Sequence, residues 1–447
     1  MVDRHSDSGW LLHIGAGLSS VSTLRHARAE GIRTVAVDID PNAPGLAHAT
    51  KFIERSRDDL AGILRDVRAF TEQNRLSGCS TTSSEPAALD AAASIREEYN
   101  LPGLRRAAMT ALADRSIWKK RLIDDAIQTP TSALLSTPEE LDLFLADQTC
   151  VLVKPESGGR GSLGVSRLRR GDVRSRDLYE DAREHSTSGL VLAEAFVAGD
   201  EYSIDGIMRD GVFQMLHLGR KFSARNHRGT LPTGYAWGAP RKDTRSDEDP
   251  RWDEYRALAS AVGDALGMHD TFLSLDVIDN GERTFVVDIG CQLDAKVDRG
   301  LAFSGLDVAE LDCAIAMGQS CQLDREPGAL TRGYAIRFFY ASVDGRLSRS
   351  ADSEARSLEA SAQHWRAIEM PPFRTLVEWE REIGAPVKRP RSVSDLVACA
   401  LVEAEDRNHA WMRCNEIESS ALFTIQESPD SGSSEANEWH VRRSNSS

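Results

Sequence analysis

The sequence predicts an α/β protein made of several domains. Near its start, an apolar run from Trp10 to Ile14 leads into the turn Gly15-Ala16-Gly17, a helical segment from Ser20 to Glu30 and a second apolar run from Thr34 to Asp38. Further along, a short apolar strand ends in a lysine beside a glycine-rich loop, and two apolar strands carrying aspartates flank a tight turn. A length of 447 residues suggests about two to four domains.

Composition and charge exclude several classes of protein. Hydrophobic residues make up 41% and charged residues 28% of the chain, as in a globular protein. The 54 basic and 69 acidic residues give a net charge of −15, which argues against a nucleic acid partner. No apolar run approaches about 18 residues, so no membrane span is expected, and the polar start predicts no secretory signal. The seven cysteines are scattered without CxxC spacing, so we expect reduced thiols in a cytoplasmic protein.

Residues 9–103 are predicted to form an open α/β unit. The spacing Gly15-x-Gly17-x-x-Ser20, with Asp38 closing the second strand, partly matches a dinucleotide-binding fingerprint. The third glycine of that fingerprint is missing. We therefore favour a strand–turn–helix unit that binds no NAD.

The stretch from Val151 to Val165 is the most informative in the chain. An apolar strand ends at Lys154, and a glycine-rich loop follows at once, containing Gly158, Gly159, Arg160, Gly161 and Ser162. Free backbone N–H groups beside a fixed positive charge suit the phosphates of a nucleotide. The lysine precedes the glycines, so this is not a Walker A loop. A structural salt bridge for Lys154 and a plain flexible turn are the alternatives.

Two acidic features lie downstream of this loop. A strand ends at Glu194, and after a short linker Glu201 opens the next strand; two surface acids are the alternative interpretation. Later, apolar runs on either side of Asn280-Gly281 predict a hairpin. That hairpin would bring Asp276 and Asp288, one from each strand, to a shared ligand. Hard oxygen ligands facing a phosphate loop suggest Mg²⁺.

A strand ending in lysine, a glycine-rich loop, a Glu-linker-Glu segment and a carboxylate hairpin, in this order, resemble the ATP-grasp superfamily. The resemblance covers residues 9 to 425. This superfamily includes D-alanine–D-alanine ligase, biotin carboxylase, carboxylate–amine ligases of purine synthesis and L-amino acid ligases. It implies an N-terminal open α/β (pre-ATP-grasp) domain at 9–103, a nucleotide-binding body at 104–323 and a C-terminal α+β cap at 324–425. Residues 1–8 and 426–447 are expected to be disordered.

The resemblance also implies ATP and Mg²⁺ as cofactors and a role for each site residue. Lys154 and the glycine-rich loop would hold phosphates, and Asp276 and Asp288 would bind the metal. Glu201 would contact the ribose, and Arg115, which follows the expected helix N-cap Asp114, would replace a phosphate-binding lysine. The adenine edge would be read by four consecutive hinge residues: Glu194, Ala195, Phe196 and Val197. A basic residue directed at phosphate or substrate would be Lys221, with Arg220 as second choice.

The sequence departs from the family pattern after the second aspartate. Relatives have asparagine and arginine where this chain has Gly290 and Gln292. A glycine offers no side-chain ligand, which puts a second Mg²⁺ in doubt. Arg299 or Lys296 could replace the lost arginine, and a solvated loop is the equal alternative for this charged segment.

Three further elements are expected from local pattern. Residues 334–340 read as a strand. Residues 394–408 read as a helix with an apolar face formed by Leu396, Val397, Ala400, Leu401 and Ala404. The polar stretch from Ser223 to Gly238 is long enough for a substrate lid.

We therefore expect an ATP-dependent carboxylate–amine ligase that forms an amide through an acyl phosphate and releases ADP. The layout is most similar to L-amino acid ligases, which suggests a small carboxylate and a small amine as substrates, with an amino acid or peptide as first guess. Two alternatives stay open: a carboxylase-type enzyme using bicarbonate, and a nucleotide-binding regulatory protein without catalysis. A homodimer is compatible with the resemblance.

Overall fold

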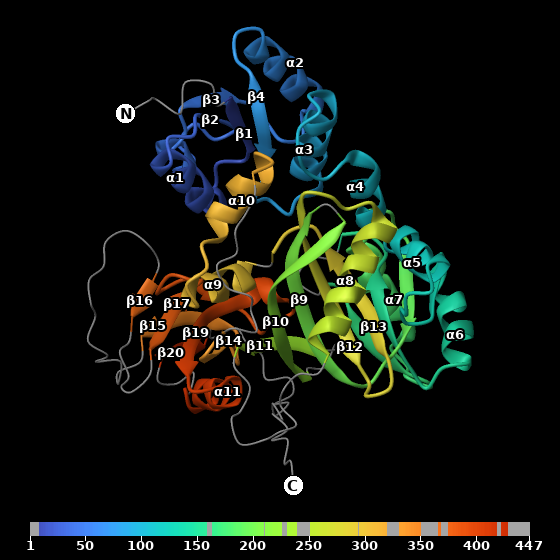
Figure 1. Ribbon diagram of the computed structural model, residues 1–447. Helices are drawn as coiled ribbons and strands as arrows, with labels where there is room; N and C mark the ends of the chain where they lie inside the picture. Colours follow the sequence, from blue (N-terminus) through green and yellow to red (C-terminus); the bar gives the residue numbers. More distant parts are fainter. Residues whose placement is uncertain are drawn as a thin grey trace.

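The computed structural model describes residues 9–158, 163–209, 211–225, 230–238, 251–293, 295–319, 330–349, 365–367, 374–417 and 422–427. Within these ranges the strands form four sheets. Figure 1 shows an N-terminal α/β unit above a body that contains a small helix-covered sheet on one side and a large sheet continuing into the C-terminal part. The mixed α/β class is as predicted.

The N-terminal unit is a parallel sheet of order β3-β2-β1-β4. On one face of this sheet, the buried side chains that pack against helices are Leu12, Ile14, Val35 and Val37. Helices cover the other face as well, as is usual for a parallel sheet. The elements are β1 (Trp10–Ile14), α1 (Val21–Ala29), β2 (Thr34–Asp38), β3 (Lys51–Glu54), α2 (Leu60–Thr71), β4 (Leu76–Ser80) and α3 (Pro86–Glu98).

The glycine turn after β1 is held by the second strand. Gly15 has a φ of +93°, a conformation that favours glycine. The Ala16 amide donates to Oδ2 of Asp38 at 2.6 Å, and the Asp40 amide donates to Oδ1 at 3.0 Å. Both carboxylate oxygens of Asp38 are thus engaged by the backbone. This arrangement favours the structural interpretation of the turn over a dinucleotide site.

A small antiparallel sheet of order β5-β8-β6-β7 carries the lysine strand and the start of the glycine-rich loop. Two helices pack on it through Leu141, Leu145, Leu178 and Tyr179. The elements from the linker onward are α4 (Arg106–Ala113), α5 (Arg115–Asp124), β5 (Ser132–Leu135), α6 (Pro138–Ala146), β6 (Cys150–Pro155), β7 (Ser166–Arg169), α7 (Ser175–Glu184) and β8 (Val191–Ala195). Asp114 accepts from the amides of Ser116 and Ile117, which confirms it as the N-cap of α5.

The large sheet has nine strands in the order β13-β12-β9-β10-β11-β14-β19-β17-β16. Its first part comprises β9 (Asp200–Arg209), β10 (Val212–Arg225), β11 (Thr230–Gly238), β12 (Thr271–Asp279) and β13 (Thr284–Gly290), and α8 (Trp252–Leu266) covers one face. The remaining elements are α9 (Ala295–Phe303), α10 (Val308–Ala316), β14 (Gly333–Tyr340), β15 (Gly345–Arg349), β16 (Trp365–Ala367), β17 (Thr375–Trp379), β18 (Pro386–Val387), β19 (Leu396–Ala404), α11 (Arg407–Glu416) and β20 (Phe423–Glu427). Strand β14 pairs with β11, so the sheet runs without a break into the expected cap.

The helix expected at 394–408 is wrong. Residues Leu396–Ala404 form strand β19, which lies between β14 and β17, and the helix α11 begins only after Asp406, which caps it through the amides of Asn408 and His409. Val397 and Ala398 pack on one cluster while Cys399 and Leu401 pack on another. A strand buried on both faces has no period-two pattern, so its apolar run looks like the face of a buried helix.

The stretch 223–238, which we expected to form a substrate lid, consists largely of two paired strands. Residues up to Arg225 continue β10, and Thr230–Gly238 form β11, which pairs with it in antiparallel register. The segment 226–229 lies outside the described residues. A polar composition misled the interpretation here, because a strand pair beside a polar site carries polar side chains on one face.

Helix α10 belongs spatially to the N-terminal unit, although it follows the body in sequence (Figure 1). Cys313 and Ala316 pack against Leu11 and Ala27. Asp312 accepts from Thr23 at 3.0 Å and from Ser80 at 2.8 Å. The chain thus returns to its first domain after completing the large sheet.

We predict that Asp312→Ala lowers the free energy of unfolding by about 1–3 kcal/mol, because two partly buried hydroxyls lose their acceptor. Urea denaturation measures this change. The matched control, Glu310→Gln on the exposed side of the same helix, should change it by no more than about 0.5 kcal/mol. Equal effects of the two substitutions would show that Asp312 does not anchor α10.

Candidate active site

The two aspartates predicted to share a ligand are direct cross-strand partners. Asp276 of β12 lies opposite Asp288 of β13. Opposite residues of an antiparallel pair point to the same face, so both carboxyl groups lie on the face away from α8. On the other side of β12, Asp276 lies opposite Ser203 of β9, which lies opposite Gly219 of β10. We call these four residues, Gly219, Ser203, Asp276 and Asp288, the aspartate row.

Lys221 is the basic residue that reaches this face. Its ammonium lies 2.6 Å from Oδ2 of Asp276 and 2.7 Å from Oε1 of Glu201. Burial alone would lower the pKa of Lys221, but the two carboxylates outweigh it and raise the pKa well above its usual value. Arg220 points to the opposite face, where it pairs with Asp200 at 2.6 Å. Of the two basic residues considered from sequence, only Lys221 thus lies with the aspartates.

Negative charge exceeds positive charge around the aspartate row. Burial raises the pKa of Asp276 to about 7; the Lys221 ammonium opposes this rise, while Glu201 and Asp288 add to it. The side chain of Asp288 is half exposed. A β-carbon at Gly290, beside Ser274, would meet no atom closer than 3.6 Å, so space is open next to the aspartates. Oxygen ligands, surplus negative charge and open space fit a Mg²⁺ ion that keeps several waters.

Arg115 bridges the aspartates and the lysine strand. Its guanidinium donates to the carbonyls of Pro155 and Glu156 at 3.4 Å and lies 3.6 Å from Oδ1 of Asp288. Its Nε is buried and has no hydrogen-bond partner. A buried donor without an acceptor is costly. The position suits the phosphate contact that the resemblance implies.

Lys154 is not a free ammonium. It lies 2.5 Å from Oε2 of Glu194, and Lys119 of α5 lies 2.9 Å from Oε1. Glu194 is almost fully buried; burial would raise its pKa, but the two ammonium groups lower it. Two lysines around one carboxylate leave a net positive charge beside the glycine-rich loop. Gly158 has a φ of +79°, and a β-carbon there would lie 3.1 Å from the His185 carbonyl; residues 159–162, with Gly159, Arg160, Gly161 and Ser162, lie outside the described residues.

The hinge after β8 is only partly open to a ligand. The amide of Ala195 donates to Thr131 and that of Phe196 donates to Cys150. The Glu194 side chain is committed to the two lysines. In the described part of the chain the Val197 amide has no partner, so this amide is open to a ligand. The guanidinium of Arg167 stacks 3.6 Å from the Phe196 ring centroid at the edge of this hinge.

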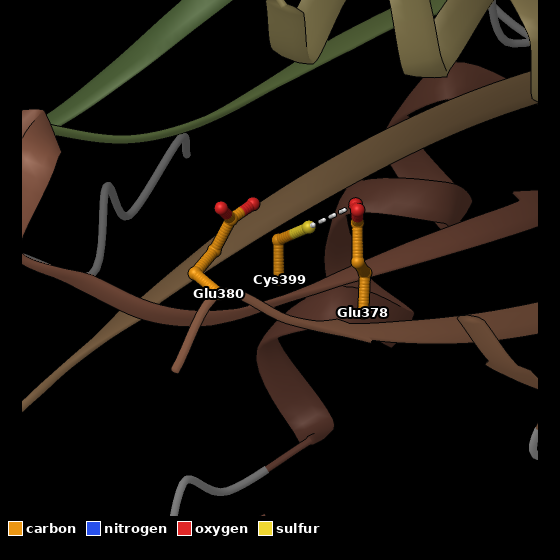
Figure 2. A group of neighbouring side chains, drawn as sticks. All are labelled: Glu378, Glu380 and Cys399. Atoms are coloured by element: carbon orange, nitrogen blue, oxygen red, sulfur yellow. Dashed lines mark hydrogen bonds between the residues drawn. The ribbon is translucent and has the colours of Figure 1, made fainter. Parts of the chain in front are cut away.

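Arg299 and Lys296 lie on helix α9, so the solvated-loop interpretation is wrong. Arg299 pairs with Glu378 at 2.8 Å and also with Glu380, and Lys296 pairs with Glu380. Figure 2 shows Cys399 between the two glutamates, with its thiol directed at Glu378. These three side chains are close enough to hold a metal, but the basic residues already offset both carboxylates. The cluster therefore joins α9 to β17 and β19, and the prediction that Arg299 acts in catalysis gains no support from its contacts.

Comparison with solved structures identifies the fold. The L-amino acid ligase from Bacillus licheniformis is similar over 95% of this chain and 100% of its own, with 17% identity and a TM-score of 0.69. The biotin carboxylase domain of the Hydrogenobacter thermophilus 2-oxoglutarate carboxylase, in complex with MgADP, ADP and bicarbonate, is similar over 94% and 91%, with 15% identity and a TM-score of 0.66. Phosphoribosylglycinamide synthetase from Anaerococcus prevotii is similar over 94% and 100%, with 15% identity and a TM-score of 0.62.

The chain therefore has the ATP-grasp fold, as its motifs predicted. No protein-family model matches the sequence, and no curated protein matches it either. In the described ranges, no helix is long and apolar enough to cross a membrane.

Several site residues were missed by sequence reasoning. Lys119 completes the lysine pair around Glu194, and Gln292 donates to the Thr81 carbonyl at 2.6 Å, tying the hairpin to the N-terminal unit. His217 and Asp205 form a buried pair next to the aspartate row. The place of His217 and Asp205 in apolar strands could have signalled them, since buried polar groups need partners. The partners of Lys119 and Gln292 come from distant segments, which no local pattern specifies.

We predict that Glu194→Gln lowers the free energy of unfolding by about 3–5 kcal/mol, because it leaves two buried ammonium groups without a counter-ion. The matched change Lys154→Ala should cost only about 1 kcal/mol, since Glu194 keeps Lys119. Thermal and urea denaturation distinguish the two. A larger loss for Lys154→Ala would contradict this view of the cluster.

We also predict that the affinity for Mg²⁺ falls as the pH drops below about 7. Asp276 must be deprotonated to bind the ion, and burial sets its pKa to about 7 in the metal-free protein. Calorimetric titration at pH 6 and pH 8, with Mn²⁺ as a second probe, measures the difference. Asp276→Asn should weaken binding and remove most of this pH dependence, whereas Asp288→Asn should weaken binding and keep it. An unchanged pH dependence in Asp276→Asn would rule out this carboxyl as the titrating ligand.

Proposed function

We propose that this protein is an ATP-dependent, ADP-forming ligase that joins a carboxylate to an amine. The proposal rests on one observation: a positively charged cluster and a negatively charged cluster lie on either side of Arg115. Lys154 and Lys119 give the small sheet a positive charge, and Asp276, Asp288 and Glu201 give the large sheet a negative one. A nucleotide bound as its magnesium salt complements both sides. The fold shared with MgADP-binding and ligase structures supports the same assignment.

In this mechanism the residues bind and orient rather than react covalently. Lys154 and Arg115 hold the phosphates of ATP, and the Val197 amide binds the adenine edge. The γ-phosphoryl group passes to the substrate carboxylate, and Lys221 offsets the charge spread over its oxygens. When bound to Asp276 and Asp288, Mg²⁺ supplies further charge neutralisation. An amine then displaces phosphate from the acyl phosphate, and the enclosed site limits hydrolysis of this intermediate.

We infer small-molecule substrates, with an amino acid or a short peptide as the first choice. The similarity to the L-amino acid ligase extends over 95% of this chain. This support is at the level of fold, and substrate choice depends on individual side chains.

We predict that the wild-type protein releases ADP and phosphate from MgATP when mixed with the twenty L-amino acids, and that omitting single amino acids from the mixture identifies the pair used. Lys154→Ala should lose ADP release by at least about a hundredfold, because one phosphate-facing charge is missing. Its retained Glu194–Lys119 pair keeps it folded. Turnover of Lys154→Ala at the wild-type rate would refute the phosphate assignment.

Two other outcomes favour the alternatives. ADP release that depends on bicarbonate alone would support a carboxylase-type reaction, as suggested by the bicarbonate-bound neighbour. Tight ATP binding without ADP release under any of these conditions would support a regulatory nucleotide-binding protein. Gly290 and the commitment of Gln292 to Thr81 give that second alternative its basis. Gly290→Asn tests it directly, because the open space at this position accepts a side chain.

A further inference from the structure

His217 lies in a fixed orientation on the same face of the sheet as the aspartate row. Its Nδ1 lies 2.9 Å from Oδ2 of Asp205, and the two side chains are 2% and 0% exposed. Ser203 donates to Oδ2 of Asp205 and Ser274 donates to Oδ1, so this carboxylate is held on both oxygens. A carboxylate only accepts hydrogen bonds. It therefore keeps the proton on Nδ1 and leaves the lone pair of Nε2 for another partner.

The imidazole ring leans over Gly219 and thus into the aspartate row. A β-carbon at Gly219 would lie 2.4 Å from Cε1 and 2.7 Å from Nε2 of His217, so only glycine allows this ring position. The edge of the ring packs against Trp237, at 5.5 Å between ring centroids. Trp237 is in turn fixed against Gly300 of α9. Among the described residues, Nε2 has no hydrogen-bond partner.

The order of residues along β9 gives the position of this histidine relative to the nucleotide. Glu201, next to the hinge, comes first, Ser203 of the aspartate row follows, and Asp205 comes last. Successive residues on one face of a strand lie about 7 Å apart. His217, opposite Asp205, therefore lies farther from the hinge than the aspartate row does. In the proposed reaction, an amine that approaches from this side would meet the imidazole.

The other titratable groups described on the neighbouring strands of this face are already committed. Glu201 and Asp276 bind Lys221, which stays protonated between them. Asp288 faces Arg115 and the metal position. Asp205 is hydrogen-bonded on both oxygens. Farther along the same face, Cys399 donates to Glu378, which pairs with Arg299. Among these described groups, Nε2 of His217 is a ring nitrogen without a hydrogen-bond partner, while Nδ1 is held by Asp205.

We propose that His217 takes the proton from the attacking amine; this inference rests on the proposed ligase function. An amine is largely protonated in neutral solution and must lose a proton to act as a nucleophile. The neutral amine then attacks the acyl carbon. The carbon–nitrogen bond forms, the carbon–oxygen bond to phosphate breaks, and phosphate leaves with the electron pair. One proton of the ammonium group thus moves to Nε2, where Asp205 stabilises the resulting imidazolium, and the second proton, lost as the amide forms, leaves with the phosphate.

The test compares two nucleophiles for the same acyl phosphate. Hydroxylamine is a weak base that is already unprotonated at neutral pH, so it needs no proton acceptor, whereas an amino acid amine does. With MgATP, the mixture of twenty L-amino acids and hydroxylamine, His217→Gln should form hydroxamate and ADP within about threefold of wild type. Without hydroxylamine, its amide formation should fall by about 10²–10⁴-fold.

Two further variants make the result decisive. Gly219→Ala keeps the histidine but displaces its ring, so it should show the same selective loss, and it decides the question if His217→Gln does not fold. His409→Gln removes a matched Asp–His pair on α11, where Nδ1 of His409 lies 2.6 Å from Asp406, and should react like wild type with both nucleophiles.

Loss of both hydroxamate and amide in a folded, ATP-binding His217→Gln or Gly219→Ala variant would overturn the proposal, as would retained amide formation. Absence of hydroxamate and ADP with the wild type would instead refute the ligase function itself. The two failures are thereby distinguished.

Discussion

The ammonium of Lys221 between Glu201 and Asp276 is the interaction on which the site depends. It is buried on a sheet face that also carries Asp288, so Lys221 and Arg115 together face three carboxylates. Such an arrangement is unfavourable without a further cation, because burying unpaired charge is costly. Burial raises the pKa of Asp276 to about 7, and the nearby carboxylates of Glu201 and Asp288 add to this rise. A divalent ion with its phosphates completes the charge balance, which connects the stability of this face to ligand binding.

The opposite imbalance occurs on the small sheet, and the two are held apart by the fold. Glu194 fixes Lys119 and Lys154 but neutralises only part of their charge. Arg115 lies between the two sheets, with contacts to Pro155 on one side and Asp288 on the other. Contacts at the periphery then keep the parts in place. Gln292 ties the hairpin to Thr81, and Arg299 ties α9 to Glu378. Arg299 and Lys296, which the sequence suggested as replacements for the family's arginine, thus hold helix α9 against the large sheet.

The sequence predicted those features that depend on local chemistry. Asn280-Gly281 defined the hairpin and hence the pairing of Asp276 with Asp288, because turn type determines register. Asp114 was recognisable as an N-cap from its side chain alone. Strand β19 was misread as a helix, since a strand buried on both faces lacks alternation. The ion pairs of Lys154 and Arg299 depend on which distant strands become neighbours, which no local pattern specifies.

The His217–Asp205 pair differs from the cluster of Glu378 and Glu380, because it has a nitrogen left for a ligand. Glu378 and Glu380 lie against Arg299 and Lys296, so their charges are offset within the protein. In the His217–Asp205 pair, the carboxylate is satisfied by two serines, but the imidazole still has an open nitrogen above a glycine. A β-carbon at position 219 would lie 2.4 Å from Cε1 of His217, so a larger residue there would displace the imidazole. The space above Gly219 thus keeps the imidazole in the aspartate row, at the cost of the strand stability that a larger residue would add.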